Sequence, residues 1–449
     1  MTKIKTIKAR EILDSRGIPT VETTVLLEDG SFGTASVPSG SSTGEHEAWE
    51  LRDNDPERFF GKGVLLAVEN VNKKIGELLQ EEMVTNQKSI DQKMIEADGT
   101  KNKKNLGANA ILSVSLAVAK AAAESLDLPL YKYLHELYTL DGSWQEGLGV
   151  TGDKFRVPKI MSVVIEAGKH SASNIEVQEF MIIPLETTSY GEALEETAEV
   201  YHELAEILKS KEKSVNVGLE GAYGPGLDSN HEAIEYILEA VKKAIQLRPK
   251  SFAGQGKDNI KIALDVAASE FFKNEDGGRY ALKSENIGLT TGQMIGLLSE
   301  WAEKYPIISI EDGLAQDDFE GWKNLTEKLG QDILIVGDDL TVTSADRLKE
   351  CIDQKIANAL IIKPNQIGTL TETFETIKLA KEFGYKTIIS HRSGETNETF
   401  IADLSVAVSS DFIKTGAPSR GERLAKYNRL LEIEEGLHIN EQFPISPST

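Results

Sequence analysis

The sequence predicts an α/β protein in which a barrel of eight β-strands ringed by helices follows a smaller α+β domain. Five short apolar runs recur at intervals of 25 to 28 residues, the length of a strand followed by a helix. They begin at Ile307, Ile333, Ala359, Thr387 and Phe412. Earlier runs near Val157, Glu176 and Lys261 bring the number of strands to eight, which closes such a barrel. An open doubly wound sheet is the alternative, but the glycine-rich dinucleotide fingerprint typical of the commonest open sheets is missing.

The N-terminal domain is predicted to pack a small sheet against helices. Residues 3–12 and 21–27 alternate as strands do, and Asp29-Gly30 predicts a hairpin turn into a third strand at 31–37. The stretch 107–126 is rich in alanine and leucine and apolar almost all round, which predicts a buried helix. Residues 140–155 are rich in Gly, Asp, Ser and Thr and predict a linker. We therefore place the capping domain at 1–140 and the barrel at 150–435.

Composition narrows the classes of function. With 72 acidic and 49 basic residues, the formal charge is −23, which disfavours nucleic acid or an anionic membrane as partner and favours a cation-dependent site. The single cysteine, Cys351, excludes a disulfide framework and a thiolate zinc site. No apolar run approaches the length of a membrane span, and the start MTKIKTIKAREILDS lacks the apolar core of a signal peptide. We expect a soluble cytoplasmic protein.

Charged or hydroxyl side chains stand at seven predicted strand ends. They are Glu179, Asp265, Glu311-Asp312, Asp338-Asp339, Lys363, Ser390 to Ser393 and Lys414. Because the chemistry of such barrels lies at the carboxyl ends of the strands, we expect these groups to meet at one mouth. Any single acid could be a solvated turn residue, but seven coincidences at one rim favour a site.

Three of these acids predict a metal site. Asp265, Glu311 and Asp338 supply hard oxygen ligands from neighbouring strands, which suits magnesium. Lys363 and Lys414 face them across the mouth. A lysine buried near cations is disfavoured in its charged form, so its pKa is expected to fall from roughly 10.4 toward neutrality, where it can act as a base. Salt bridges between these lysines and the acids are the alternative interpretation.

The segment SHRSGET, residues 390–396, predicts a phosphate clamp. Arg392 can bind a phosphate through two parallel hydrogen bonds, and Ser393 and the amides around Gly394 add donors. As an alternative role, Ser393 could cap a helix predicted at 395–409, and both roles can coexist.

The candidate site residues lie in stretches that closely resemble the enolase (phosphopyruvate hydratase) family, and the resemblance extends over essentially the whole chain. These stretches are DSRGIPTVE, VPSGSSTGEHEAWELRD, GANAILSVSLAVAKA, QEFMIIP, LDVAASEF, SIEDG, GDDLTVT, IIKPNQIGTLTET, SHRSGET, IKTGAP and ERLAKYN. The resemblance implies an N-terminal α+β domain and a barrel whose second strand runs antiparallel to the rest. It also implies glycolytic interconversion of 2-phosphoglycerate and phosphoenolpyruvate with two Mg²⁺ ions per closed site, in a homodimer or an assembly of dimers.

The resemblance implies a role for each matched residue. Asp265, Glu311 and Asp338 match the ligands of the first magnesium, and Ser42, in the loop SGSSTG, matches the serine that completes the second. Lys363 matches the general base, Glu220 the general acid and Glu179 its carboxylate partner. The matched substrate contacts are His170, Glu179, Asp338, Ser390, His391, Arg392, Ser393 and Lys414. Only the resemblance singles out Glu220.

Two segments depart from the family pattern. Glu166-Ala167-Gly168 stands where the family usually has Asn-Gly-Gly, with Val163 in place of an earlier asparagine, and Leu219-Glu220-Gly221-Ala222 replaces Asp-Glu-Gly-Gly. Alanine restricts the backbone more than glycine, so we expect altered loop closure that affects rate and affinity more than reaction class.

These departures and the subunit contacts leave other readings open. One is a catalytically weak paralogue that acts as a binding or cell-surface protein. Another is a different lyase or racemase of the superfamily, although such sites generally lack SHRSGET together with SGSSTG. Of the family's dimer contacts, Arg10 can meet Glu422, but the partner expected opposite Glu22 is Glu432, a like charge.

Overall fold

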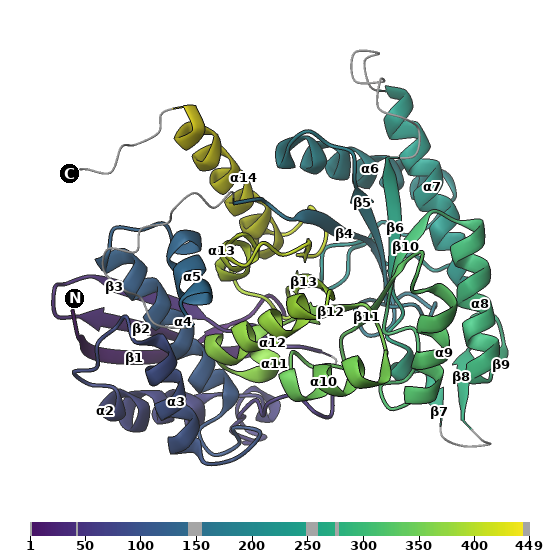
Figure 1. Ribbon diagram of the computed structural model, residues 1–449. Helices are drawn as coiled ribbons and strands as arrows, with labels where there is room; N and C mark the ends of the chain where they lie inside the picture. The colour runs from purple at the N-terminus through teal and green to yellow at the C-terminus, as the bar shows by residue number, and fades with distance from the viewer. Residues whose placement is uncertain (1, 42–43, 142–154, 248–258, 274–277, 443–449) are drawn as a thin grey trace.

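The computed structural model describes residues 2–41, 44–141, 155–247, 259–273 and 278–442. A small N-terminal α+β part, purple and blue in Figure 1, lies beside a larger barrel part that runs from teal to yellow. Within the described ranges, no helix has the length and apolar character needed to cross a membrane.

A three-stranded antiparallel sheet forms the centre of the N-terminal part. Its strands pair in the order β1 (Ile4–Leu13), β2 (Pro19–Leu27) and β3 (Phe32–Ser36). Helix α4 (Ala108–Ser125) packs on this sheet and is buried on nearly every side, as predicted. Strand β3 approaches α4 so closely that a Cβ at Gly33 would lie 2.2 Å from the nitrogen of Ala121, so this position requires glycine. The remaining helical elements are η1 (Phe59–Gly61), α1 (Leu65–Glu69), η2 (Asn70–Ile75), α2 (Gly76–Leu78), α3 (Gln87–Asp98) and α5 (Leu130–Thr139).

Eight strands close a barrel in the hydrogen-bonded order β10-β11-β12-β13-β14-β4-β5-β6. Their bounds are β4 (Lys159–Glu166), β5 (Glu179–Pro184), β6 (Ile260–Asp265), β10 (Ile307–Glu311), β11 (Leu334–Gly337), β12 (Ala359–Ile362), β13 (Lys386–Ser390) and β14 (Phe412–Lys414). Strand β5 is antiparallel to both β4 and β6, and every other neighbouring pair is parallel. The predicted barrel with an antiparallel second strand is therefore confirmed, and the open sheet is wrong because closure leaves no free edge.

Helices surround the barrel (Figure 1). They are α6 (Tyr190–Ser210), α7 (Asn230–Leu247), α8 (Thr291–Lys304), α9 (Phe319–Leu329), α10 (Ala345–Gln354), α11 (Pro364–Ile367), α12 (Leu370–Glu382), α13 (Phe400–Ala407) and α14 (Gly421–Gln442). Five begin with a side chain that accepts a backbone N–H, each worth about 1 kcal/mol; the capping residues are Ser189, Thr290, Asp318, Ser344 and Thr369. The turn η3 (Ala268–Glu270) leads to a small sheet of β7 (Phe272–Lys273), β8 (Arg279–Leu282) and β9 (Ile287–Leu289).

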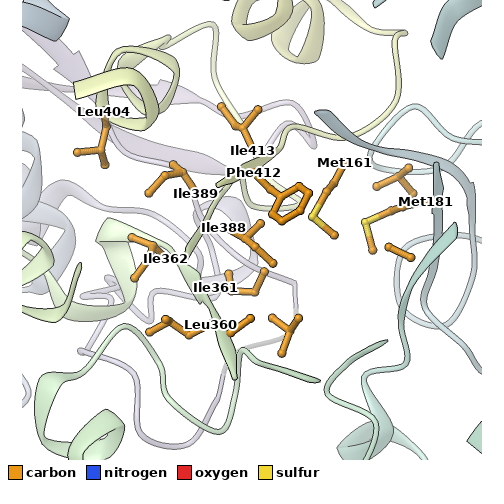
Figure 2. Packing of buried hydrophobic residues seen from close by; sticks show 14 of the residues in the cluster. Met161, Met181, Leu360, Ile361, Ile362, Ile388, Ile389, Leu404, Phe412 and Ile413 are labelled. Atoms are coloured by element: carbon orange, nitrogen blue, oxygen red, sulfur yellow. The ribbon is translucent and has the colours of Figure 1, made fainter. Parts of the chain in front are cut away.

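Apolar side chains of the barrel strands form a continuous core. Figure 2 shows Ile361 of β12 beside Ile388 of β13, with which it is in register, and Met161 of β4 near Phe412 of β14. Ile361, Ile388 and Met161 are fully buried, and each such side chain contributes roughly 1.5–3 kcal/mol. This packing fixes the strand ends on which the site is built.

Some boundaries differ from the prediction. The strand starts agree to within three residues. The helix predicted at 395–409 is shorter, because α13 begins at Phe400 with Thr399 as its N-cap residue. The proposed cap by Ser393 is therefore wrong. Helix α5 ends at Thr139 and β4 begins at Lys159, but most of the predicted linker lies outside the described residues, so the domain limits 1–140 and 150–435 stay predictions.

Candidate active site

The barrel strands bring the predicted charged residues to one mouth. Asp265 and Glu311 end β6 and β10, and Lys414 ends β14. Glu179 differs, because it is the first residue of β5 rather than the last. Since β5 runs antiparallel, its first residue lies at the same mouth, in register with Asp265 on β6. A carboxylate at the start of this one strand thus joins carboxylates at the ends of the others.

Lys414 connects three of these acids. Its Nζ lies 2.9 Å from Glu179 Oε2, 3.1 Å from Asp265 Oδ2 and 2.9 Å from Glu311 Oε2. Burial disfavours its charge, but Asp265, Glu179 and Glu311 outweigh burial and raise its pKa well above the usual value. The ammonium group therefore neutralises part of a dense acidic cluster.

Lys363 binds the remaining acid of the predicted metal set. It directly follows β12, and its Nζ donates a 2.5 Å hydrogen bond to Asp338 Oδ2. Gln366 donates to the other oxygen, Asp338 Oδ1, at 2.9 Å, and both oxygens of Asp312 accept amides, those of Asp338 and Asp339, at 2.9 Å. Asp312, predicted only as a strand-end acid, thus holds the backbone that carries Asp338.

The expected fall in lysine pKa concerns a site that holds divalent cations, and it stays a prediction. For the protein chain alone, burial is the largest single influence on Lys363 and lowers its pKa, but nearby carboxylates, Asp338 first and then Glu311, act against burial, and the net pKa lies above the usual value. The sequence-based expectation counted nearby cations and left out the carboxylate in direct contact. The alternative interpretation, salt bridges between the lysines and the acids, correctly describes these contacts.

Glu220 lies on the other side of Glu179, in a buried group of histidines and carboxylates. His170 Nδ1 lies 3.4 Å from both Glu179 Oε1 and Glu220 Oε1. Burial, followed by the charge of Glu220, raises the pKa of Glu179 well above its usual range. Burial also opposes ionisation of Glu220, but His391 and His170 hold its pKa well below the usual value. Of these two carboxyls, Glu220 therefore ionises more readily than Glu179.

Arg423 fixes the tautomer of His391. This arginine of α14 is fully buried, and its Nη1 lies 2.6 Å from His391 Nδ1. A guanidinium can only donate, so Nδ1 accepts and the imidazole proton sits on Nε2, which faces Glu220 Oε2 at 3.4 Å. Burial lowers the pKa of His391 to about 4, so the ring is neutral. His391, predicted as a substrate contact, is placed here to donate toward the predicted acid.

The SHRSGET segment holds its arginine ready for an anion. Arg392 Nη1 donates to Glu47 Oε2 at 2.9 Å and Nη2 donates to Glu47 Oε1 at 3.2 Å. This is the two-pronged geometry expected for phosphate, with a carboxylate of the chain in the place of the anion. Ser393 Oγ accepts the amide of Ser41 at 2.7 Å, and Ser390 Oγ donates to the backbone oxygen of His391 at 3.0 Å. Ser42, the predicted ligand of a second magnesium, lies outside the described residues.

The two departures from the family pattern have different structural effects. Neither Ala167 nor Ala222 adopts a positive φ, whereas their neighbours Gly168 and Gly221 do, at 52° and 85°. The alanines therefore occupy positions that suit an L-residue and introduce no backbone strain. Glu166 connects the two departing segments, because its carboxyl group accepts the amides of Glu220 and Ala222.

Both parts of the chain match known families. Residues 4–134 match the family model described as enolase, N-terminal domain, and residues 154–445 match the one described as enolase, C-terminal TIM barrel domain. The chain belongs to the enolase family. Family members are lyase-type enzymes that usually use Mg²⁺, and the barrel-mouth carboxylates are where such an ion belongs.

The enolase-family mouth has a donor set that fits a hard divalent cation. Among the described residues, two groups bring ligand atoms within 4.8 Å of one another: Asp312 with Asp338 and Asp339, and Glu166 with His170 and Glu220. Burial and then Asp265 raise the pKa of Glu311 well above its usual range, a crowding of acids that a divalent cation would relieve. The first group offers only oxygen atoms, as magnesium prefers, and of the three predicted ligands it contains Asp338 but not Asp265 or Glu311. In the second group, backbone amides bind the carboxyl group of Glu166, and His170 adds nitrogen atoms to the carboxyl oxygens.

Several residues of this site were not singled out from the sequence. Arg423 lies in the matching stretch ERLAKYN, but a buried arginine in a surface-patterned helix has no sequence signal of its own. Glu47 and Gln366 also lie in matching stretches, and only the folded chain shows that they contact Arg392 and Asp338.

Proposed function

We propose that this enolase-family protein catalyses the reversible dehydration of 2-phospho-D-glycerate to phosphoenolpyruvate and water. The proposal is based on one observation: lysines and a glutamate, the groups that could act as base and acid, lie on different sides of the barrel mouth. Lys363 and Lys414 lie among carboxylates on one side, and Glu220 lies with two histidines on the other. Removing a proton and expelling hydroxide need a separate base and acid, and this arrangement supplies both.

Each side chain then has a defined task. Lys363 takes the proton at carbon 2, once it has released its ion pair with Asp338, and Glu220 gives a proton to the departing hydroxyl at carbon 3. Lys414 holds the substrate carboxylate, while Arg392 with Ser390 and Ser393 binds the phosphate after Glu47 has moved aside. Magnesium, held by Asp265, Glu311 and Asp338 and at a second position by Ser42, would supply positive charge for the carboxylate as it becomes more negative.

A direct assay tests the proposal. Purified protein with Mg²⁺ and 2-phosphoglycerate should develop the ultraviolet absorbance of phosphoenolpyruvate, and Lys363→Ala should abolish that signal. Lys386→Ala is a matched control, because Lys386 also binds an aspartate, Asp411 at 2.9 Å, but at the start of β13, at the opposite end of the barrel. No product from the wild-type protein would reject the enzyme and favour a binding or cell-surface paralogue.

We also propose a cytoplasmic homodimer. Support comes from the family resemblance and from Arg10 and Glu22, which lie on paired strands of the N-terminal sheet and bind each other at 2.7 Å. Both side chains are therefore already ordered at the positions where the family makes its subunit contact. Sedimentation and cell fractionation would test the two parts of this proposal separately.

A further inference from the structure

Glu166 lies directly behind the loop that carries Glu220. It is the last residue of β4 and is fully buried. The amide of Glu220 donates to its two carboxyl oxygens at 3.2 and 3.1 Å, and the amide of Ala222 donates to Oε1 at 3.0 Å. A Cβ at Gly218 would lie 2.5 Å from the carboxyl carbon of Glu166, so the loop closes tightly around this group. Strand β4 and the loop are thus joined through one carboxyl group.

The surroundings of Glu166 contain many acids and little fixed positive charge. The titratable or charged groups that face it come from five elements: Glu220 from the loop, His170 from the turn after β4, Glu179 from β5, Tyr201 from α6 and Arg423 from α14. Among them, Arg423 alone is permanently positive, and its N–H groups are bonded to His391 and to the backbone oxygens of Leu219, Arg392 and Ser393. Little fixed positive charge is therefore directed at the carboxyl group of Glu166, whose side-chain hydrogen bonds come from backbone amides.

The charge balance of the pair follows from this setting. Burial, followed by the charge of Glu220, raises the pKa of Glu166 to about 8, although the amide bonds and Arg423 act in the opposite direction. One carboxyl oxygen of Glu166 lies within 4.8 Å of one of Glu220. Two buried carboxyls this close resist being ionised at the same time, so the pair loses its protons in two steps, and neither step belongs to one residue alone. Near neutral pH the pair keeps one proton, and the negative charge of either member favours protonation of the other.

On the basis of the function proposed above, we propose that Glu166 is a positioning residue that shares one proton with Glu220 and keeps that proton available to the general acid. The proton passes from a Glu166 oxygen to a Glu220 oxygen and then to the departing hydroxyl, which leaves as water. Glu166 remains as a carboxylate until solvent returns a proton. The asparagine usual in the family at this position could accept the same amide bonds but could not hold the proton.

The test compares how kcat depends on pH in three variants. Glu166→Gln keeps the size of the side chain and an oxygen for the loop amides but removes the titratable proton. In this variant the charge of Glu166 no longer opposes the lowering of the Glu220 pKa by His391 and His170, and Glu220 loses its proton at a lower pH. The pH at which kcat falls on the alkaline side should therefore decrease by about one pH unit, while kcat at acidic pH should change less. The side chain of Glu166→Asp can still ionise. In this variant kcat should fall at the same alkaline pH as in the wild type, even if the shorter side chain reduces kcat at every pH.

A control and a contradictory outcome complete this test. Asp91, on α3 of the N-terminal part, is another buried acid, whose pKa is raised to about 6 and which accepts the amide of Thr371 at 3.0 Å. Asp91→Asn should leave the alkaline fall in kcat at the wild-type pH. If Glu166→Gln instead lowers kcat by the same factor at every pH, Glu166 only supports the loop and the proposal is wrong.

A second measurement does not need turnover. Infrared spectra of the substrate-free protein should contain the carbonyl band of a protonated carboxyl that disappears as the pH rises through about 8, and Glu166→Gln should lack that band. If the wild-type protein shows the band but makes no phosphoenolpyruvate, the proposed reaction fails and the shared proton stands. If it makes phosphoenolpyruvate and the variant spectra are identical, the shared proton is rejected.

Discussion

Both sides of the barrel mouth bury several acids, but the surroundings of those acids differ. On one side, Asp265, Glu311 and Asp338 are paired with lysines at 2.5 to 3.1 Å. On the other, Glu166 and Glu220 lie among backbone amides and histidines, and burial raises the pKa of Glu166 to about 8. Burying a charge is costly on either side, so each must be compensated. The lysines carry a positive charge that can bind an anion, and they can be displaced from the carboxylates by a metal ion. A proton shared between Glu166 and Glu220 can instead be donated in a reaction.

Asp338→Ala should have the largest effect, because it removes the partner of Lys363 and a predicted magnesium ligand together. We expect activity to be lost while the fold remains, since relieving crowded acids at a rim costs little stability. Activity as a function of Mg²⁺ and calorimetry with and without Mg²⁺ would measure both effects. Asp346→Ala, at an exposed acid of α10, is the control and should resemble the wild type. An unchanged magnesium dependence in Asp338→Ala would reject the ligand assignment.

Exchange at carbon 2 separates the base on one side from the acid on the other. In heavy water with 2-phosphoglycerate, Glu220→Gln should still exchange this hydrogen, because Lys363 is intact, while making almost no phosphoenolpyruvate. Lys363→Ala should do neither. Each loss should lower the overall rate by a factor on the order of 10²–10⁴, the usual contribution of a positioned acid or base. Nuclear magnetic resonance of the recovered substrate measures the exchange.

The reverse pattern would exchange the roles of the two sides. If exchange survives in Lys363→Ala and is lost in Glu220→Gln, the glutamate is the base and the lysine is the acid. Retained exchange in both variants would place the base elsewhere, and Lys414 would be the next group to test.

The periodicity of the strands predicted the side of the mouth that contains Lys363 and Lys414, the lysine-rich side, far better than the side that contains Glu166 and Glu220. Asp265, Glu311, Lys363 and Lys414 end or follow barrel strands, so a regular repeat of strand and helix locates them. Glu220 lies in a loop with no period, and family resemblance alone identified it. The pairing of Lys363 with Asp338 depends on a 2.5 Å contact between residues that follow separate strands, which no local pattern encodes. Glu179 was placed at the mouth correctly, although it lies at the start of its strand.

Glu47→Gln should have a smaller effect, on anion binding at the lysine-rich side. Its carboxylate now occupies the fork of Arg392, so phosphate must displace it. An amide binds a guanidinium more weakly, and we expect inorganic phosphate to bind a few-fold more tightly in the variant. Competition against 2-phosphoglycerate would measure this. Glu45→Gln, two residues away and exposed, should leave the affinity unchanged. Weaker phosphate binding in Glu47→Gln would mean that Glu47 assists the clamp rather than competing with it.

The smallest effect is expected away from the mouth, at the proposed dimer contact. Family resemblance places Glu432 opposite Glu22 of a second copy, and each already has an arginine of its own chain: Arg429 lies 3.0 Å from Glu432, and Arg10 lies 2.7 Å from Glu22. Repulsion between the two glutamates is therefore damped but not replaced by attraction. Glu432→Arg would replace this repulsion by an attraction to Glu22. Because exposed ion pairs are weak, the dissociation constant of the dimer should fall only about twofold to fivefold.

Sedimentation of a dilution series at low and high salt would measure this change. The gain should shrink at high salt, because mobile ions screen exposed charges. Glu432→Gln, which removes the repulsion without adding attraction, should fall between the wild type and Glu432→Arg. Arg429 should stay in place in both variants, since it also binds Asp403 at 2.7 Å. If Glu432→Arg weakens the dimer instead, Glu432 does not face Glu22 of the second copy, and the subunit contact proposed here is wrong.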